Sequence, residues 1–462
     1  MDVAEVLKIA DYLMFESTSK YLDDLQKSIV QGVYEGKKYS KIAEESHCSE
    51  GHVTDMASNL WKALSDAIGE KVSKSNLKSA IERYQFSITS SFHWKDVVQI
   101  GDLNFCSDFK NSDRPENQND AKLNNDLVKV QKDVGNIPDL FPFYGRSSEL
   151  NQFKQWVVKE HCRIVTIFGM SGIGKTALVR QLLEEIRDEF DKIIWLNLGC
   201  QRSIVEFMDK DLLPSLSPDR KIDPNLDIAA RISLSIEHLQ RQRYLIILDD
   251  FNRIFSNEQL AGTYAEGCED YGLLLKRIIE SKHQSCILLL SWDKPREIDL
   301  LAGENKLVQT LQLNGLGESA REILKDKGLT EESQWTDLIN HYQGNPLWLK
   351  IVATMVKDLF AGRVDELTKY ETLFLPDDLR SILNFQFIRL SELEKQVMLS
   401  IASQSQSVSI PQLIEYTQIS PPDLLNVLQS LGRRALVEKQ ESPTGTLFSM
   451  QVILRKFTNC QS

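Results

Sequence analysis

An apolar, β-branched segment followed by a glycine-rich loop constrains the fold of this chain more than any other feature. Residues Ile164 to Phe168 precede the motif G-x-x-x-x-G-K-T, which runs from Gly169 to Thr176, and apolar residues at helical spacing follow over 177–183. A strand, a loop and a helix in this order are typical of a phosphate-binding P-loop. A chance match of the motif would have to reproduce the flanking strand and helix as well. The sequence therefore predicts a nucleotide-binding site.

The residue types in the loop fit this chemistry. Glycine permits backbone conformations in which successive N–H groups point at a polyphosphate, and the next helix adds a partial positive charge at its N-terminus. Lys175 supplies a full positive charge, and the hydroxyl of Thr176 is a suitable ligand for Mg²⁺. We expect the nucleotide to contact the loop and the first turn of the helix, namely Gly169, Met170, Ser171, Gly172, Ile173, Gly174, Lys175, Thr176 and Ala177.

A second apolar run ends in two carboxylates. Residues 243–248 lack polar alternation, which is typical of a strand buried on both faces of a parallel sheet, and Asp249 and Asp250 follow directly. We expect Asp249 to hold the Mg²⁺ shell and Asp250 to orient a water for attack on the γ-phosphate. The alternative is a solvated pair of aspartates at a strand end, but the position downstream of a P-loop favours the metal site.

Composition limits the partners of the chain. Its 462 residues suffice for about three domains. The net charge of −12 argues against a broad electrostatic grip on nucleic acid. No apolar stretch is long enough to span a bilayer and the N-terminus lacks signal-peptide features, so we expect a cytoplasmic protein with no membrane partner. Seven scattered cysteines without a C-x-x-C pair predict reduced thiols.

The first 85 residues predict an all-α domain. A short helix over 39–45, a turn at 47–49 and a longer helix beginning after Ser49, a good N-cap, form a helix-turn-helix pattern. Residues 1–84 carry 11 Lys/Arg and 14 Asp/Glu, and the expected recognition helix has acids at positions 50 and 55. Residues that read DNA are usually Arg, Lys, Asn or Gln. We therefore favour a protein-interaction or signalling role, with DNA binding as the alternative.

The remaining chain predicts three further domains after a linker. Polar residues without periodicity place the linker at 86–142, and alternating strands and helices over 143–312 predict a three-layer α/β P-loop NTPase domain. A helical subdomain at 313–375 follows, and three helices with a hairpin predict a winged helix at 376–462. We interpret Arg433 and Arg434 as an exposed helix end rather than a DNA clamp.

These parts in this order resemble an NB-ARC protein of the STAND (signal-transduction ATPase) class, of cyanobacterial type. The motifs at 39–43 and 49–53 resemble the helix-turn-helix domain associated with vWA–MoxR systems. The segment 143–146 resembles the one that flanks the adenine in the family. Gly344-Asn345-Pro346-Leu347 stands where the family has G-L-P-L, which implies that Pro346 lies against the adenine.

The resemblance implies a mechanism and its ligands. ADP and ATP, with Mg²⁺, are the expected ligands, and the implied resting state is ADP-bound and closed, opened by exchange for ATP. A protein partner of unknown identity and nucleotide-dependent homo-oligomerisation are the implied outputs.

The chain departs from the family pattern at two positions. The family's sensor strand often ends with an arginine that reaches the γ-phosphate, where this chain has Trp292, and the family's Met-His-Asp is replaced by Met450-Gln451-Val452. Neither tryptophan nor glutamine supplies a positive charge. The implied enzyme is thus a weak ATPase at most. Two alternatives are a nucleotide-responsive transcription regulator and a non-hydrolysing ADP-bound scaffold. A metabolic kinase is disfavoured, because the sequence shows no site for a second substrate.

Overall fold

The computed structural model describes most of residues 142–461 and parts of the first 77 residues. Gaps in the larger part fall at 199–202, 219–221, 303–305, 371–372, 405 and 444, and the described N-terminal stretches are 22–34, 37–46, 48–68 and 72–74 with four single residues. The expected linker lies outside the described residues except for its last residue. Contacts divide the chain into two compact units, residues 1–99 and 100–462.

The first unit contains a helix-turn-helix. Its described helices are α2 (Asp24–Tyr34), α3 (Tyr39–Glu45) and α4 (Glu50–Ile68). The Ser49 hydroxyl accepts a hydrogen bond from the His52 backbone N–H at 3.3 Å, so the expected N-cap is present. Apolar residues at helical spacing along α4, such as Val53 and Leu60, are fully buried against the other two helices. The short helix, tight turn and long helix are those expected from the sequence.

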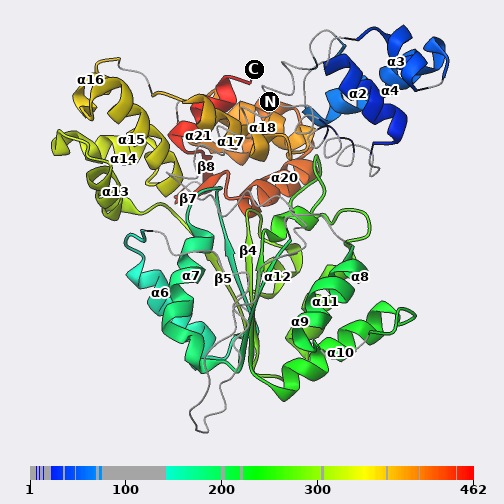
Figure 1. The fold of residues 1–462 in the computed structure, drawn as a ribbon. Coiled ribbons are helices and arrows are strands. Elements are labelled where there is room, and N and C mark those ends of the chain that lie inside the picture. The colour runs from blue at the N-terminus through cyan, green and yellow to red at the C-terminus, as the bar shows by residue number, and fades with distance from the viewer. Residues whose placement is uncertain are drawn as a thin grey trace, which may run out of the picture. The chain divides into compact units, whose positions relative to one another are not determined.

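A five-stranded parallel sheet forms the centre of the second unit (Figure 1). Its strands are β1 (Ile164–Phe168), β2 (Lys192–Asn197), β3 (Tyr244–Asp249), β4 (Cys286–Ser291) and β5 (Val308–Gln312). Their order is β2-β3-β4-β1-β5. All four neighbouring pairs are parallel, so every strand ends at the same edge. Phe168 pairs with Ser291 and Asn197 with Asp249, which aligns the loops that follow.

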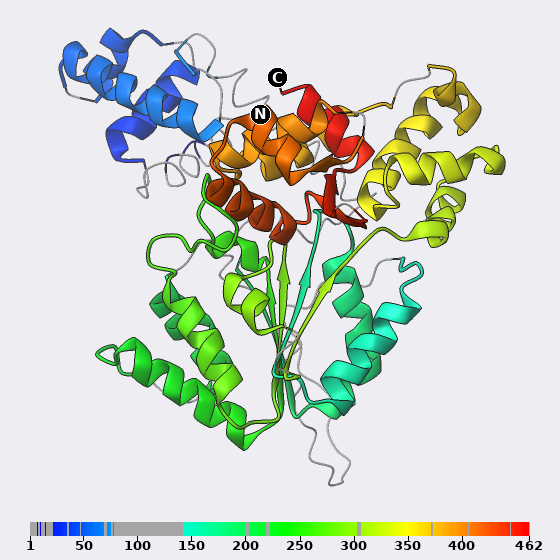
Figure 2. The same cartoon turned by 180° about the vertical axis from the view of Figure 1, so that it is seen from behind.

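Helices cover both faces of the sheet, as Figures 1 and 2 show. One face packs on α6 (Ser147–Lys154) and α7 (Lys175–Ile186) through a core that includes Val165 and Leu288. The other face is covered by α8 (Ile204–Phe207), α9 (Leu213–Leu216), α10 (Ile228–Arg241), α11 (Asp270–Glu280) and α12 (Arg296–Leu301). Every residue of β1, β3 and β4 is buried, because strands covered on both faces need apolar side chains on both. The expected three-layer α/β domain is confirmed.

A helical segment follows β5. Its α-helices are α13 (Arg321–Asp326), α14 (Trp335–His341), α15 (Pro346–Phe360) and α16 (Val364–Thr368). Asn345 caps helix α15, because its side chain accepts from the backbone N–H groups of Leu347 and Trp348. Proline suits the first helical position, because an N–H group at that position would have no acceptor within the helix.

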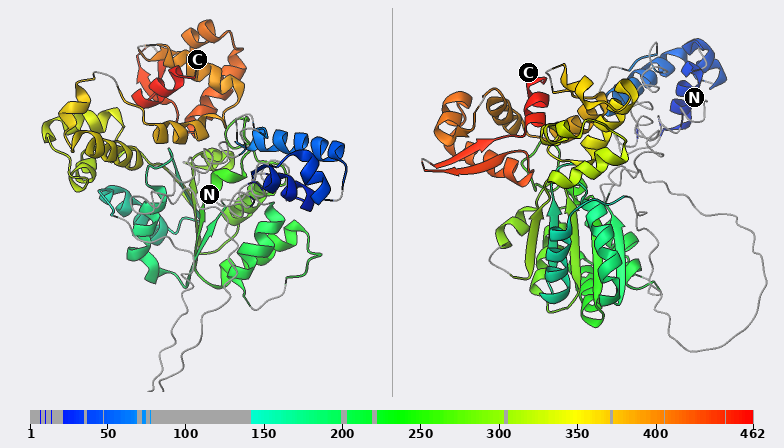
Figure 3. Two further views of the ribbon diagram at one scale, coloured as in Figure 1. Left: turned by 45° about the horizontal axis from the view of Figure 1, so that its top comes forward. Right: turned by 90° about the vertical axis from the view of Figure 1, so that its left-hand side faces the viewer.

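The C-terminal segment contains three helices followed by an antiparallel hairpin, as expected, and two further helices. Its elements are α17 (Asp377–Phe387), α18 (Glu392–Ala402), β6 (Val408–Ser409), α19 (Ile410–Thr417), α20 (Pro421–Arg433), β7 (Glu438–Ser442), β8 (Gly445–Ser449) and α21 (Val452–Asn459). The hairpin extends from the helices (Figure 3). The first strand of the hairpin begins at Glu438, shortly after Ala435, whose positive φ of 55° follows the end of α20. Within the described residues, none of the helices combines the length and apolarity that crossing a bilayer requires.

Candidate nucleotide-binding site

The glycine-rich loop connects the end of β1 to the start of α7. Gly169, Gly172 and Gly174 have φ values of 146°, 73° and 99°, a region that side chains with a Cβ rarely adopt. Lys175 is the first residue of α7 and is only 4% exposed. Its Nζ donates to the carbonyl oxygens of Gly169 and Met170, both at 3.1 Å. The ammonium group is therefore held inside the turn of the loop.

The hydroxyl of Thr176 and the carboxylate of Asp249 meet at the edge of the sheet. Thr176 Oγ1 lies 3.2 Å from Asp249 Oδ2 and 3.4 Å from Oδ1, although the residues come from α7 and β3. A hydroxyl beside a carboxylate at the mouth of a phosphate loop is the oxygen ligand set that suits Mg²⁺. These residues fit a bound Mg²⁺, which would neutralise negative charge on nucleotide phosphates.

Asp250 is held in an unusual conformation next to this pair. It has φ of 57°, and its backbone N–H donates to Asp249 Oδ1 at 2.9 Å. The Asn197 side chain donates to Asp250 Oδ2 at 3.1 Å. This left-handed region is uncommon for residues other than glycine, although aspartate adopts it more readily than most, and such conformations recur at functional sites. Asn197 was not expected at this site, although a polar residue at the end of the neighbouring strand β2 was a signal that could have identified it.

Two segments far from the loop in sequence bind its backbone. Arg146 Nη2 donates to the Ile173 carbonyl at 3.0 Å, and Asn345 Nδ2 donates to the Ser171 carbonyl at 3.0 Å. The expected adenine contact, Pro346, follows Asn345 as the first residue of α15 and is half-buried. Ala177 lies half-buried in the first turn of α7. The structure thus brings the start of α15 against the loop residues that the motif predicted.

Close packing at Gly172 gives a first prediction. A Cβ on Gly172 would lie 2.3 Å from Leu347 Cβ, and the φ of 73° adds strain. We expect Gly172→Ala to weaken ADP binding at least tenfold, because the loop and α15 must separate to admit the methyl group. Gly328→Ala is the matched control, since Gly328 has φ of 75° but no heavy atom within 4 Å of the added Cβ. Equal losses in both variants, measured by calorimetric titration, would show that strain alone is responsible.

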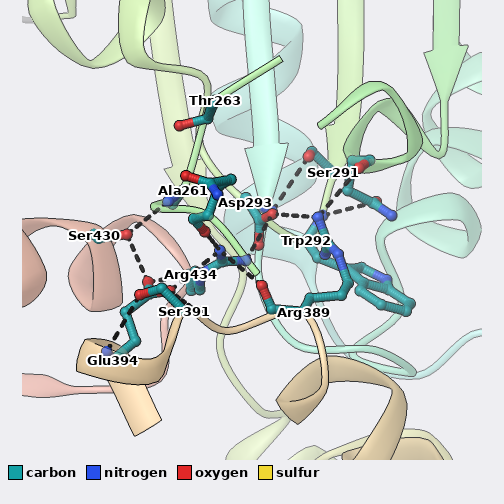
Figure 4. Close-up of polar contacts among 12 residues, drawn as sticks. Ala261, Thr263, Ser291, Trp292, Asp293, Arg389, Ser391, Glu394, Ser430 and Arg434 are labelled. Carbon is teal, nitrogen blue, oxygen red and sulfur yellow. Dashed lines mark hydrogen bonds and ion pairs between the residues drawn. The ribbon is translucent and has the colours of Figure 1, made fainter. Parts of the chain in front are cut away.

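A buried charge network joins the end of β4 to the C-terminal segment (Figure 4). Asp293 Oδ2 accepts from Arg389 Nη2 at 2.7 Å and from Arg434 Nη1 at 3.3 Å. Arg434 Nε also donates to Glu394 Oε1 at 2.9 Å, and the hydroxyl of Ser430 donates to the same oxygen at 2.6 Å. Arg434 is 3% exposed and Glu394 is 0% exposed. The interpretation of Arg434 as part of an exposed helix end was wrong, because the nucleotide domain covers this end of α20.

The network balances two arginines against two carboxylates. Burial is the main cause that lowers the pKa of Arg389, and Asp293 opposes it. For Arg434 burial also lowers the pKa, but Asp293 and Glu394 outweigh it, so the net shift is upward. Both arginines stay charged at neutral pH.

Trp292 lies between this network and the end of β4. Its backbone N–H donates to Asn252 Oδ1 at 3.1 Å, and the Arg389 guanidinium lies 5.3 Å from the centroid of its ring. A guanidinium over an indole face is a favourable cation–π contact. The position that lacks a cation in the sequence therefore has one nearby in space, supplied by Arg389.

A glycine-rich loop between a strand and a helix, with a lysine inside it and carboxylates at the ends of neighbouring parallel strands, defines a P-loop NTPase domain. Residues 146–265 match the NB-ARC domain family, and residues 1–84 match the N-terminal HTH of vWA-MoxR associated proteins. The chain therefore contains an NB-ARC domain, which is a P-loop NTPase domain of the STAND type, and a helix-turn-helix N-terminal domain.

Relatives of known sequence extend the comparison. An uncharacterized WD repeat-containing protein of Nostoc sp. is 38% identical over 322 residues, which cover 66% of this chain and 26% of that protein. The disease resistance protein RRS1 of Arabidopsis thaliana is 25% identical over 314 residues, covering 63% of this chain and 22% of that protein. The chain thus spans about a quarter of the length of these relatives.

Two of the solved structures similar to this chain are archaeal. A Walker-type ATPase of Pyrococcus abyssi has a TM-score of 0.45 at 14% identity, covering 70% of this chain and 99% of that chain. A STAND protein with a tetratricopeptide repeat sensor from Pyrococcus horikoshii has a TM-score of 0.35 at 16% identity, covering 72% of this chain and 45% of that chain.

Proposed function

We propose that this protein is a nucleotide-controlled signalling switch, closed with ADP bound and opened when ATP replaces ADP. The observation that carries the proposal is that the helical segment and the C-terminal segment both form hydrogen bonds or ion pairs with the nucleotide domain beside the site. Asn345 at the start of α15 binds the loop itself, and Arg389 and Arg434 bind Asp293 just after β4. A ligand in the loop would bias such a two-state arrangement, because the fastened segments and the phosphates share the same edge of the sheet. The C-terminal segment, with three helices and a hairpin, acts in this proposal as a winged helix.

The site residues take separate roles in the proposal. The loop backbone and Lys175 bind the phosphates, Thr176 and Asp249 hold Mg²⁺, and Pro346 packs on the adenine. Asp250, held by Asn197, orients the attacking water. Hydrolysis is slow in this proposal, because Arg389, the cation beside Trp292, is bound to Asp293 rather than free to reach a phosphate.

The first test identifies the nucleotide that the protein retains. The purified full chain is denatured, and the released nucleotide is identified by chromatography. In a separate measurement, light scattering gives the mass of the folded protein in solution with ADP, with ATP and with a non-hydrolysable analogue. Retained ADP and a larger assembly only with ATP or the analogue are expected. Retained ATP, or an unchanged mass in all three states, would contradict the switch.

Asp250→Asn supplies a test of the catalytic assignment. An amide cannot accept the proton of the attacking water, so we expect the hydrolysis rate to fall by roughly 10² to 10⁴ while ADP affinity stays within about twofold. The measurement is single-turnover hydrolysis of labelled ATP together with ADP titration. An equal rate in both proteins would remove Asp250 from the mechanism. A wild type that never hydrolyses ATP would favour the non-hydrolysing scaffold.

We infer that the N-terminal domain acts through a protein rather than DNA. Among the described side chains of α4, the exposed ones include Glu50 and Asp55 and a single cation, Lys62. Phosphate contacts require Lys or Arg, and base contacts favour the residue types that this face lacks at its N-terminal end. No salt-dependent shift of genomic DNA fragments is expected in a gel assay. A specific shift that weakens steeply with salt would instead support a nucleotide-responsive transcription regulator.

A further inference from the structure

A segment of the nucleotide domain, to which the proposed function gives no role, directly follows Asp250. It covers residues 251–263, which we call the η5 segment, and starts with the short 3-10 helix η5 (Phe251–Ile254). The Ser256 N–H donates to the Thr263 carbonyl at 2.8 Å, which closes the segment into a loop. Asp250, the residue assigned to water orientation, is thus joined directly to the first residue of this loop.

Four hydrogen bonds join the η5 segment to the C-terminal segment in the described part of the chain (Figure 4). Each of them uses a backbone group of the η5 segment. The four pairs, with the donor first, are Arg389 Nη2 with the Asn252 carbonyl at 3.2 Å, the Glu258 N–H with the Arg389 carbonyl at 2.9 Å, Arg434 Nη2 with the Gln259 carbonyl at 2.6 Å, and the Ala261 N–H with Ser430 Oγ at 2.6 Å. Because all four involve backbone groups, they fix the path of the η5 segment rather than the position of single side chains.

Asn252 connects the η5 segment to the end of β4. It is 2% exposed, and its Oδ1 accepts from the Trp292 N–H at 3.1 Å. Its side chain thus binds the residue that follows β4, while its backbone carbonyl binds Arg389. A buried acceptor paired with a backbone N–H holds both partners in place, because an unpaired polar group in the interior is unfavourable. Asn252 is therefore the residue at which the ends of β3 and β4 meet the C-terminal segment.

The conformation of Asp250 depends on its contacts on both sides. Asn197 binds its carboxylate, and its backbone carbonyl accepts from the Arg253 N–H of η5 at 2.9 Å. Its φ of 57° is uncommon for a residue with a side chain, and such a conformation persists only where the surrounding contacts specify it. Displacement of η5 would rotate the backbone of Asp250 and move its carboxylate. A misplacement of about 1 Å is enough to lower a catalytic rate about 10²-fold.

We propose that Asn252 is a positioning residue for Asp250, and that ATP is hydrolysed only while the C-terminal segment is docked on the η5 segment. The inference rests on the proposed switch and specifies how its hydrolysis is regulated. In the open arrangement with ATP bound, the four hydrogen bonds are absent, η5 is not held, and Asp250 does not orient the water. The signalling state therefore lasts until the C-terminal segment docks again.

Docking then permits the step that resets the switch. The water oxygen bonds to the γ-phosphorus, and the bond from that phosphorus to the β–γ bridging oxygen breaks. Asp250 accepts a proton of the water and releases it to solvent, and the products are ADP and inorganic phosphate. ADP stays in the closed site, which is the resting state of the proposed switch.

The experiment measures two quantities on the full chain: the rate constant of single-turnover hydrolysis of labelled ATP, and the affinity for ATP by titration. Asn252→Ala should lower the rate constant roughly tenfold and leave ATP affinity within about twofold, because it loosens the contacts around Asp250 and leaves the phosphate-binding loop unchanged. A purely structural role would lower both quantities together. That result would overturn the proposal.

Ser430→Ala tests docking from the other partner. It removes the acceptor of the Ala261 N–H and should lower the rate constant about three- to tenfold. Ser235→Ala is the matched control, because Ser235 is 1% exposed and its hydroxyl donates to the Arg231 carbonyl within α10 at 3.2 Å. This control should hydrolyse ATP at the wild-type rate.

The double variant tests whether docking acts through Asn252. Asn252→Ala combined with Ser430→Ala should be no slower than Asn252→Ala alone, because docking no longer reaches Asp250 once Asn252 is removed. Independent effects that multiply in the double variant would overturn the coupling. So would a wild-type rate in either single variant.

The outcomes also separate this inference from the switch itself. If the wild type hydrolyses ATP but the rate does not depend on Asn252 and Ser430, the inference fails and the switch stands. A wild type without hydrolysis overturns the inference together with the catalytic assignment of Asp250. In that case the switch is tested on its own by the mass in solution with ADP and with ATP, and an unchanged mass contradicts it.

Discussion

Arg434→Ala is expected to destabilise the protein by about 3–5 kcal/mol and to speed the release of bound ADP. The variant leaves Glu394, which is 0% exposed, without its cation, and it removes one of the two arginines from Asp293. An uncompensated buried carboxylate is far more unfavourable than the loss of the pair's own attraction. Because the network fastens the C-terminal segment to the end of β4, its loss should favour the open arrangement.

The measurement combines urea unfolding with the dissociation rate of a fluorescent ADP analogue. Lys395→Ala is the control: its ion pair with Glu392 is at the surface, where Glu392 is 87% exposed, and such pairs contribute about 0–1 kcal/mol. Arg434→Lys should be intermediate, because lysine keeps the charge but not the planar fork of donors. If Arg434→Ala lowers stability while ADP dissociates at the wild-type rate, the network is structural and does not control the nucleotide.

Lys175→Ala is expected to lower ADP affinity by roughly 100-fold or more, so that the purified variant contains no nucleotide. The ammonium is the one full positive charge in the glycine-rich loop, and it lies 3.1 Å from the carbonyls of Gly169 and Met170. Removing it leaves the phosphates the backbone N–H groups, the helix N-terminus and the Mg²⁺ expected at Thr176 and Asp249, but no side-chain cation from the loop. Calorimetric titration with ADP and analysis of released nucleotide give the result.

Lys192→Ala is the control for this variant. Lys192 also binds a backbone carbonyl, that of Ser215 at 2.9 Å, but it stands at the opposite end of the sheet, at the start of β2. It should keep its nucleotide. Should Lys175→Ala retain ADP with wild-type affinity, the P-loop would be a structural element and the nucleotide would bind elsewhere.

The sequence predicted the parts of the site that depend on local order. The strand, the loop and α7 are contiguous, and Asp249 ends a run of residues buried throughout, so each could be recognised from its neighbours alone. The roles of Asn197 and Asn345 were not predicted. Each acts on a residue more than fifty positions away, at separations of 53 and 174, and no local pattern specifies such a pairing.

The C-terminal segment also shows that local sequence patterns predict helices but not the contacts between distant residues. Three helices followed by a hairpin were predicted over 376–462, whereas α17 and α21 were not expected as separate helices. Two adjacent arginines at the end of α20 look like a solvated helix terminus, because a periodic pattern reports which face is apolar but not what covers the helix end. Burial of Arg434 depends on Asp293, which lies 141 residues away.

By itself the sequence determined that this protein folds around a phosphate-binding loop and carries a helix-turn-helix, since both depend on residue types at fixed short spacings. Only the tertiary structure decided where charge resides around that loop. The chain has Trp292 at the end of β4, where the family often has an arginine. In the folded protein a cation is nevertheless present there, because Arg389 lies over the ring of Trp292. The physical reason is that electrostatic and hydrogen-bond energies depend on distance in space and on burial, neither of which is encoded in the separation of residues along the chain.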